Sequence, residues 1–187
     1  MKGISDMSLS NFPVFQTCKS TLKETSKIDN NGYMCHLENE VINFDEAKEK
    51  YIRQQIEELI AQNEIGMKSV DALCEYGKDV LFIEFKSGDV GNIDKKDIRY
   101  KIVDSLLLFI HITKCQIDYI KEHGIFILVY NSGEKSLDKI QNHVFNNAGE
   151  ERIRFGFKVH KKMFFKELHT YTLDEFENWL CQKGIIQ

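Results

Sequence analysis

The stretch Ser69–Gly88, SVDALCEYGKDVLFIEFKSG, decides the fold of this chain. It covers most of two runs with the composition of β-strands, Lys68–Tyr76 and Asp79–Lys86, which a turn at Gly77-Lys78 joins. Charged groups are costly in such an apolar hairpin unless they are paired or bind a metal. The stretch nevertheless contains Asp71, Glu84 and Lys86. It therefore predicts a hairpin that carries a functional site.

The geometry of a hairpin brings these three charged residues together. Side chains alternate between the two faces of a strand, so Glu84 and Lys86 share one face with Phe82. A hairpin that turns at residues 77–78 pairs positions whose numbers sum to about 155, which places Asp71 across from the strand end that holds Glu84. We expect two carboxylates and one lysine at the same end of the hairpin.

This set of groups suits a metal site for phosphodiester hydrolysis. Mg²⁺ prefers oxygen ligands, and Asp71, Glu84 and the backbone carbonyl of Phe85 would supply three of them. Lys86, two residues from Glu84, could orient or deprotonate the attacking water or offset charge on the phosphoryl group. The same residues also fit an ordinary sheet edge with alternating charges and cross-strand pairs, so the hairpin alone leaves both interpretations open.

Composition sets the class of protein. The chain has 187 residues, 42% hydrophobic and 29% charged, which predicts one globular domain. A net charge of −4 argues against a broad surface that coats nucleic acid but permits a local basic groove. Five scattered cysteines without a CxxC spacing indicate reduced thiols rather than structural zinc. The start lacks a signal-peptide pattern, and the longest apolar run, Ser105–Thr113, is too short to span a bilayer, so we expect a cytoplasmic protein without membrane association.

The segments before the hairpin predict little chemistry. Residues 1–30 have weak periodicity and are expected to form an N-terminal arm, and Gly32–Phe44 has room for one or two short strands. A helix begins at Asn43, with Glu46 as its capping-box partner, and ends at Gly66. Its core stripe consists of Ile52, Ile56, Leu59, Ile60 and Asn63, and Asp45 and Glu49 lie on the same stripe at its N-terminal end. Glu49 is either a rim charge that suits the helix dipole or part of the site.

The segments after the hairpin predict alternating helices and strands. Asp94 caps a long helix to Thr113, a helical turn follows to His123, and Ile125–Tyr130 is a buried central strand. Ser136–Asn147 is expected to be an amphipathic helix and Phe164–Tyr171 a last strand. A final helix is capped by Thr172 with Glu175 as its box partner.

Two basic segments are candidates for contact with nucleic acid. Lys95, Lys96, Arg99 and Lys101 open the helix after the hairpin and would face either a phosphate backbone or solvent. The segment Arg152–Lys166, RIRFGFKVHKKMFFK, mixes lysines with phenylalanines. It could line a groove in which the rings stack on bases, or form a strand whose rings pack in the core.

The quoted hairpin resembles the signature of a known superfamily. Ser69-Val70-Asp71 followed by Ile83-Glu84-Phe85-Lys86-Ser87-Gly88 is similar to the motif of the PD-(D/E)xK nucleases, which include restriction endonucleases, archaeal Holliday-junction resolvases and RecB-type nuclease domains. Val70 stands where the superfamily usually has proline. The resemblance covers residues 44–131 and fits the α-β-β-β-α-β order if an extra strand lies near residues 64–70 or before the first helix.

The resemblance implies a fold and a function. The fold is an α/β restriction-endonuclease-like core with a central mixed sheet of four or five strands flanked by helices. It is preceded by the arm at 1–30, and residues 132–187 complete the sheet and its helices. Asp71 and Glu84 would bind Mg²⁺ or Mn²⁺, Lys86 would be catalytic, and Glu49 corresponds to the acid that many members carry on the first helix.

The implied function is Mg²⁺-dependent hydrolysis of DNA, with RNA a weaker candidate, in restriction, repair or anti-phage defence. Cutting both strands would require a homodimer, since one domain offers one site. The alternative is a nuclease-like binding module without catalysis, such as an immunity or antitoxin-type protein or a subunit of a larger complex.

Overall fold

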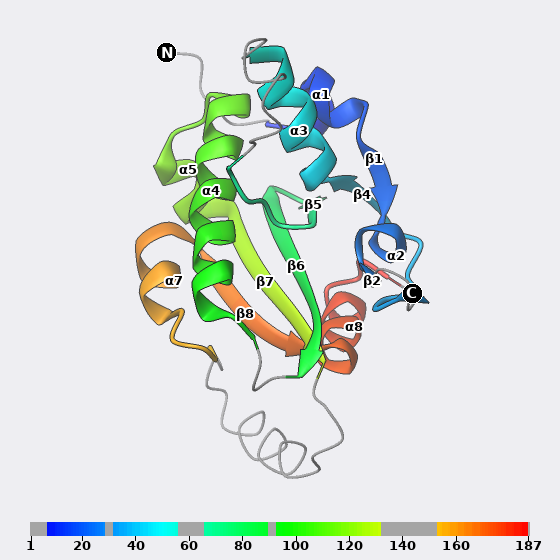
Figure 1. Cartoon of the computed structure of the whole chain (residues 1–187). Helices are drawn as coiled ribbons and strands as arrows, with labels where there is room; N and C mark the ends of the chain where they lie inside the picture. The colour runs from blue at the N-terminus through cyan, green and yellow to red at the C-terminus, as the bar shows by residue number, and fades with distance from the viewer. Residues whose placement is uncertain (1–6, 29–31, 56–65, 90–92, 132–152, 187) are drawn as a thin grey trace.

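A mixed six-stranded sheet organises the chain, with helices on both of its faces (Figure 1). The computed structural model describes residues 7–28, 32–55, 66–89, 93–131 and 153–186. The strand order is β1-β4-β5-β6-β7-β8. The pairs from β1 to β6 are antiparallel, and β6–β7 and β7–β8 are parallel. The strands are β1 (Lys19–Thr21), β4 (Glu40–Asn43), β5 (Ala72–Tyr76), β6 (Asp79–Asp89), β7 (Gly124–Asn131) and β8 (Glu167–Thr172), and β2 (Lys27–Ile28) and β3 (Gly32–Tyr33) form a separate pair.

The hairpin β5–β6 has the predicted register. Ala72 lies opposite Ile83, and Tyr76 lies opposite Asp79. The turn between the strands contains Gly77 with φ +60°, as the first central position of a type II′ hairpin turn requires. Asp71 directly precedes β5, at the level of Glu84. The predicted placement of Asp71 across from Glu84 is therefore confirmed.

Strand β5 begins at Ala72, whereas the sequence had indicated a start at Lys68. The backbone N–H of Lys68 donates to the Asp104 carboxylate at 2.9 Å, and the N–H of Val70 donates to Ser105 Oγ at 2.8 Å. Both acceptors lie on helix α4 (Lys95–Thr113). Because these donors bind helix side chains, the segment before Ala72 lies against α4 instead of extending the ladder.

The helices divide between the two faces of the sheet (Figure 1). The face that we call the α4 face packs against α1, α3, α4, α5 and the segment around α7, and the opposite α8 face packs against α2 and α8. The helices are α1 (Pro13–Gln16), α2 (Leu22–Thr25), α3 (Phe44–Gln55), α4 (Lys95–Thr113), α5 (Ile117–His123), α7 (Lys158–Phe164) and α8 (Leu173–Gln182), with a 3₁₀ turn η1 at Leu9–Asn11.

Alternating side chains of β6 and β7 fill the two cores. On the α4 face, Phe82 of β6 and Phe126 of β7 pack with Phe109 of α4. On the α8 face, Ile83 of β6 and Ile127 of β7 pack with Phe176, Trp179 and Leu180 of α8. The long apolar run of β7 is thus explained by burial on both sides, as predicted.

Three predicted helix starts are confirmed by their caps. Asn43 Oδ1 accepts from the N–H of Glu46 at 3.0 Å, and the Asp94 carboxylate accepts from Lys96 and Asp97. Thr172 and Glu175 form the complete capping box predicted for α8. The predicted continuation of the first helix over residues 56–65 and the predicted helix Ser136–Asn147 lie outside the described residues.

Other expectations were wrong. The sheet has six strands rather than four or five, because the expected arm at 1–30 supplies the edge strand β1 and Glu40–Asn43 supplies β4. Three residues, Lys19-Ser20-Thr21, are too few to show a strand period in the sequence. Residues 158–164 form α7 instead of a strand, and the last strand, expected to begin at Phe164, begins at Glu167.

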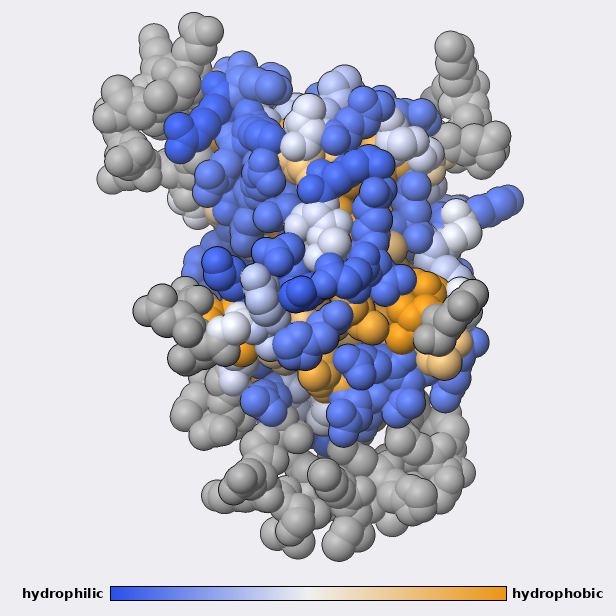
Figure 2. Space-filling view, turned by 90° about the vertical axis from the view of Figure 1, so that its right-hand side faces the viewer, coloured by the Kyte–Doolittle hydropathy of each residue, from blue (hydrophilic) through white to orange (hydrophobic). Residues whose placement is uncertain are grey.

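The side of the molecule that carries β1 and α2 is mostly hydrophilic, with small apolar patches between the charged residues (Figure 2). Exposed ion pairs lie in this region, among them Lys19 with Glu40 and Lys23 with Glu38, each at 2.7 Å. Within the described part of the chain, no helix has both the length and the apolar character needed to cross a membrane.

Candidate functional site

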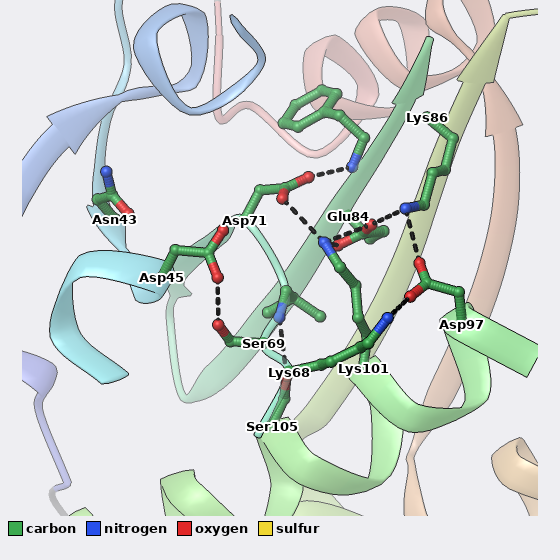
Figure 3. A network of polar contacts seen from close by, with 12 residues as sticks. Asn43, Asp45, Lys68, Ser69, Asp71, Glu84, Lys86, Asp97, Lys101 and Ser105 are labelled. Carbon is green, nitrogen blue, oxygen red and sulfur yellow. Dashed lines mark hydrogen bonds and ion pairs between the residues drawn. The ribbon is translucent and has the colours of Figure 1, made fainter. Parts of the chain in front are cut away.

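The site is built on two carboxylates that share one ammonium group. Lys101 of α4 places its Nζ 3.2 Å from Asp71 Oδ1 and 2.8 Å from Glu84 Oε2 (Figure 3). The second carboxylate oxygen of Asp71, Oδ2, accepts the N–H of Phe85 at 2.6 Å. Glu84 is fully buried on the central strand β6. The end of the hairpin and the helix above it therefore converge on a single cation position.

Lys86 occupies the neighbouring position on the same strand face. Its Nζ lies 3.1 Å from Glu84 Oε1 and 2.9 Å from Asp97 Oδ2 of α4. Asp97 also pairs with Lys68, which precedes β5 (Figure 3). Lys86 is thus held between a carboxylate of the strand and a carboxylate of the helix. The predicted association of Asp71, Glu84 and Lys86 is present in the structure.

The third element at the site is the start of α3, where Asp45 rather than Glu49 is in place. The Ser69 hydroxyl and Lys48 both contact Asp45 Oδ1, and the Asp45 charge acts on Asp71. Glu49, one helical turn further along, is exposed. The structure therefore does not bring the predicted Glu49 into the network of the two carboxylates.

The phase of α4 explains why Lys101 points inward. Ile98, Ile102 and Ser105 lie on its buried stripe. Lys101 comes three residues after Ile98 and four before Ser105, so it lies at the edge of that stripe, and Asp97 lies one turn before it. This spacing was visible in the sequence and could have indicated both Lys101 and Asp97 as site residues.

Burial and mutual repulsion perturb the two carboxylates. Burial, followed by the nearby charge of Asp71, raises the pKa of Glu84 to about 8, against the attraction of Lys101 and Lys86. Burial also raises the pKa of Asp71, although Lys101 and the Phe85 N–H oppose this effect. Carboxyl groups with raised pKa values would gain from additional positive charge, which makes this pair a candidate ligand set for a cation.

Burial and the nearby carboxylates act in opposite directions on the pKa values of the two lysines. Burial lowers the pKa of Lys101, but the charges of Glu84 and Asp71 outweigh it and the net pKa is raised. The same balance holds for the pKa of Lys86, where Glu84 and the hydrogen bond to Asp97 outweigh burial. Both ammonium groups therefore stay charged where they face the carboxylates.

A polar hollow gives solvent access to Asp71. It encloses about 280 Å³, including space open to solvent, and lies beside the short β2 strand; Lys101 is not part of its lining. Its walls are formed by Thr25, Ser26, Lys27, Ile28, Met34, Asp71, Phe85 and Ser87. Of the two site carboxylates, only Asp71 lines the hollow, so it is the one that an ion in the hollow would contact.

The donor set fits a hard cation such as Mg²⁺, which is commonly held by one or two carboxylates together with water and substrate phosphate. Glu84 Oε1 is buried, with the ammonium groups of Lys101 at 2.8 Å and Lys86 at 3.1 Å, and neither of these contacts has hydrogen-bond geometry. Asp71 and Glu84 are the two carboxylates that would hold the ion, and no group of three or more His, Cys, Asp or Glu side chains with metal-site geometry occurs in the described ranges. For Phe85, the contact with Asp71 is made by the N–H group.

The basic candidates divide into exposed and buried groups. Lys95, Lys96 and Arg99 at the start of α4 are exposed, so they remain candidates for phosphate contacts, whereas Lys101 belongs to the internal network. In the segment 153–166, Phe157 is buried, and Phe155 and Phe164 pack against the core. Of the two expectations for this segment, the packing of its rings in the core is supported, within a helix and turn rather than a strand.

The five cysteines are all free, in agreement with the expectation of reduced thiols. The contributions of Asp45, Asp97 and Ser105 to the network were not predicted from the sequence. Comparison of the chain with known protein families, with curated proteins and with solved structures finds no match.

Proposed function

We propose that this protein is a divalent-metal-dependent nuclease that hydrolyses phosphodiester bonds in DNA. The observation that carries the proposal is the convergence of Asp71 and Glu84 on one cation position, 3.2 and 2.8 Å from the same Nζ. A buried pair of carboxylates with raised pKa values costs stability, so its presence on a central strand favours a functional role.

Asp71 and Glu84 would hold Mg²⁺ or Mn²⁺, with the Phe85 carbonyl as a further ligand. When bound, such an ion supplies Lewis-acid polarisation of a phosphoryl oxygen. Lys86 lies beside Glu84 and is oriented by Asp97. Its ammonium group would orient the attacking water and stabilise negative charge that develops on the phosphate.

The order of elements supports a restriction-endonuclease-like core. Strands β4, β5 and β6 are antiparallel neighbours, and β6 continues to the parallel β7 through α4. The extra strand that the α-β-β-β-α-β order needs corresponds to β4, which precedes α3. Exposed Lys95, Lys96 and Arg99 would contact the DNA backbone, and cleavage of both strands would require two copies of the chain or a partner protein. Roles in restriction, repair or defence follow from analogy of fold alone.

A second candidate function is that of a nuclease-like binding module without catalysis. The observation in its favour is charge balance: three carboxylates (Asp71, Glu84, Asp97) are matched by three lysines (Lys68, Lys86, Lys101). Such a network is complete without an added ion. A measurement of metal binding and cleavage separates the two functions.

The test is a cleavage assay on supercoiled, linear and branched DNA and on RNA, with Mg²⁺, Mn²⁺ or EDTA. Asp71→Ala and Lys86→Ala remove one candidate ligand and the candidate catalytic lysine. Lys78→Ala, in the turn at the opposite end of the same hairpin, is the matched control. We expect metal-dependent cleavage by the wild type and by Lys78→Ala, and a loss of at least about 10²-fold in the two site variants.

The nuclease proposal is wrong if the folded wild type cleaves none of these substrates and calorimetry detects no heat of Mg²⁺ or Mn²⁺ binding. That result would favour the binding module. Undiminished cleavage by Asp71→Ala would show that the reaction takes place at another part of the molecule.

A further inference from the structure

Lys101 occupies the position that a metal ion would need. Its side chain is only 15% exposed and reaches from α4 between the two carboxylates (Figure 3). The Nζ lies within hydrogen-bonding distance of one oxygen of Asp71 and of both oxygens of Glu84. An Mg²⁺ or Mn²⁺ ion bound to the same oxygens at about 2.0–2.2 Å would coincide with this ammonium group or touch it. Two cations cannot share that position, because neither solvent nor an anion separates them.

We propose that Lys101 is an internal counter-ion that competes with the divalent metal, so that it holds Asp71 and Glu84 together in the metal-free protein and must leave them when the ion binds. The inference rests on the proposed metal site and adds a residue that controls its occupancy. It differs from the role of Lys86, which Asp97 holds on the other side of Glu84.

Two neighbouring features bear on this exchange: the hollow beside Asp71 and the carboxylate of Asp45. The lining of the hollow beside Asp71 includes neither Lys101 nor any residue of α4, so an ion in this hollow would meet Asp71 without displacing α4. Asp45 at the start of α3 lies close enough for its charge to act on Lys101. Because the four-carbon stem of a lysine is flexible, Asp45 is the carboxylate toward which the released ammonium group could turn.

The exchange has a direct consequence for metal affinity. In the wild type, a bound ion must replace charge-assisted hydrogen bonds that Lys101 already makes to both carboxylates. A variant without this ammonium group leaves Asp71 without its ion pair and Glu84 with Lys86 alone, so both carboxylates are more available to the metal. Metal binding should therefore be tighter in the variant, by at least about tenfold.

The test measures metal binding without nucleic acid. Lys101→Met removes the charge and keeps the apolar stem, and Lys101→Gln retains a hydrogen-bond donor. Lys121→Met on an exposed position of α5 is the matched control. We expect Mn²⁺ titrations by calorimetry to give a Kd at least about tenfold lower in both Lys101 variants than in wild type and control. We also expect Mn²⁺ to raise the melting temperature of the Lys101 variants more than that of the wild type.

A measurement on the unchanged protein covers the case in which the variants do not fold. Reductive methylation followed by mass spectrometry reports the reactivity of each lysine. Saturating Mn²⁺ should increase the labelling rate of Lys101 severalfold, because its ammonium group is released, and should leave that of Lys121 unchanged. Equal Mn²⁺ affinity in wild type and folded Lys101 variants, or Lys101 labelling that does not respond to saturating Mn²⁺, would overturn the inference. So would the absence of Mn²⁺ binding in every protein.

Failure of the inference is distinguishable from failure of the nuclease function. Tighter Mn²⁺ binding in the Lys101 variants without any DNA cleavage would support the counter-ion and reject the nuclease. Metal-dependent cleavage by the wild type, combined with unchanged Mn²⁺ affinity in the Lys101 variants, would support the nuclease and reject the counter-ion.

Discussion

Two neighbouring positions on opposite faces of strand β6 are equally buried, but one holds an apolar side chain and the other a carboxylate. Ile83, on the α8 face, is 1% exposed, and Glu84, on the α4 face, is 0% exposed. Ile83 packs among apolar side chains of β7 and α8, whereas Glu84 meets Lys86 and Lys101. Burial alone therefore does not decide which residue a position accepts. The α8 face is apolar at this level, whereas the α4 face, apolar at Phe82, holds at Glu84 a buried charge that needs a compensating partner.

The largest loss of stability is expected when a charge is placed on the apolar α8 face of β6. Ile83→Glu would bury a carboxylate among the apolar side chains of the α8 face, on the opposite side of the sheet from Lys86 and Lys101. We expect a loss of more than about 4 kcal/mol in the free energy of unfolding, enough to prevent folding. Circular dichroism and soluble yield report this, with Glu84→Gln as a variant that should remain folded. A folded Ile83→Glu protein would show that the two faces do not differ in the way described.

Removing apolar volume from the α8 face should be the next largest effect. Leu180 of α8 is 1% exposed, and Leu180→Ala would leave a cavity beneath Trp179 and Phe176. The expected loss in the free energy of unfolding is about 2–5 kcal/mol, measured by urea denaturation. Leu107→Ala on the solvent side of α4, where the side chain is 55% exposed, is the matched control and should change stability little. Similar losses in both variants would contradict the assignment of the core.

Around Glu84 on the α4 face, a change in one counter-charge should affect function more than stability. Asp97→Asn keeps the shape of the side chain but removes the charge that orients Lys86 and Lys68. Because these groups are partly exposed, we expect a stability loss of only about 1 kcal/mol. If the nuclease function holds, cleavage should fall by about tenfold to a hundredfold through misplacement of Lys86.

The control for Asp97→Asn is Asp118→Asn on an exposed position of α5. Calorimetry and single-turnover cleavage of both variants separate folding from positioning. A stability loss like that of Leu180→Ala, with full cleavage per folded molecule, would assign Asp97 to the scaffold instead.

The smallest expected effect concerns His169, which packs beside Trp179 of α8. Burial lowers the pKa of His169 below its usual value, in opposition to its pairing with Glu167 at 2.9 Å. As pH falls below about 6.5, the unfolded chain therefore binds a proton at this position that the folded protein does not, and stability decreases by at most about 1.4 kcal/mol per pH unit. Below the folded-state pKa this contribution to the slope disappears.

Urea denaturation between pH 5 and pH 8 tests this expectation. His169→Gln should remove this contribution to the pH dependence below about pH 6.5, whereas the exposed His36→Gln should retain it. An unchanged profile in His169→Gln would mean that other groups determine the acid sensitivity of this face.

Local patterns in the sequence were sufficient to predict much of the scaffold. The turn at Gly77 fixed the pairing of β5 with β6, and with it the position of Asp71 opposite Glu84. Cap residues located the starts of α3, α4 and α8. These features depend on interactions between residues that are close in the sequence, and such interactions can be inferred without knowledge of the whole fold.

The sequence failed where distant segments decide the outcome. Lys101 was expected to face outward with Lys95, because a run of lysines at a helix start usually faces solvent, but the carboxylates of the hairpin draw it inward. Strand β5 was expected to be longer, but α4 binds its first backbone N–H groups. In Arg152–Lys166, alternating aromatic residues suggested a strand, whereas residues 158–164 form α7 with Val159 and Met163 exposed.

The tight turn of the hairpin also has a kinetic consequence. Hairpins with short turns close within microseconds, whereas contacts over longer separations form later. Asp71 and Glu84 can therefore meet as soon as β5 and β6 pair, but Lys101 is 30 residues from Asp71 and arrives only when α4 docks. We expect the two carboxylates to repel each other in the early hairpin. Acidic solution, which protonates them, should accelerate the first step of folding and weaken the later docking of the helix.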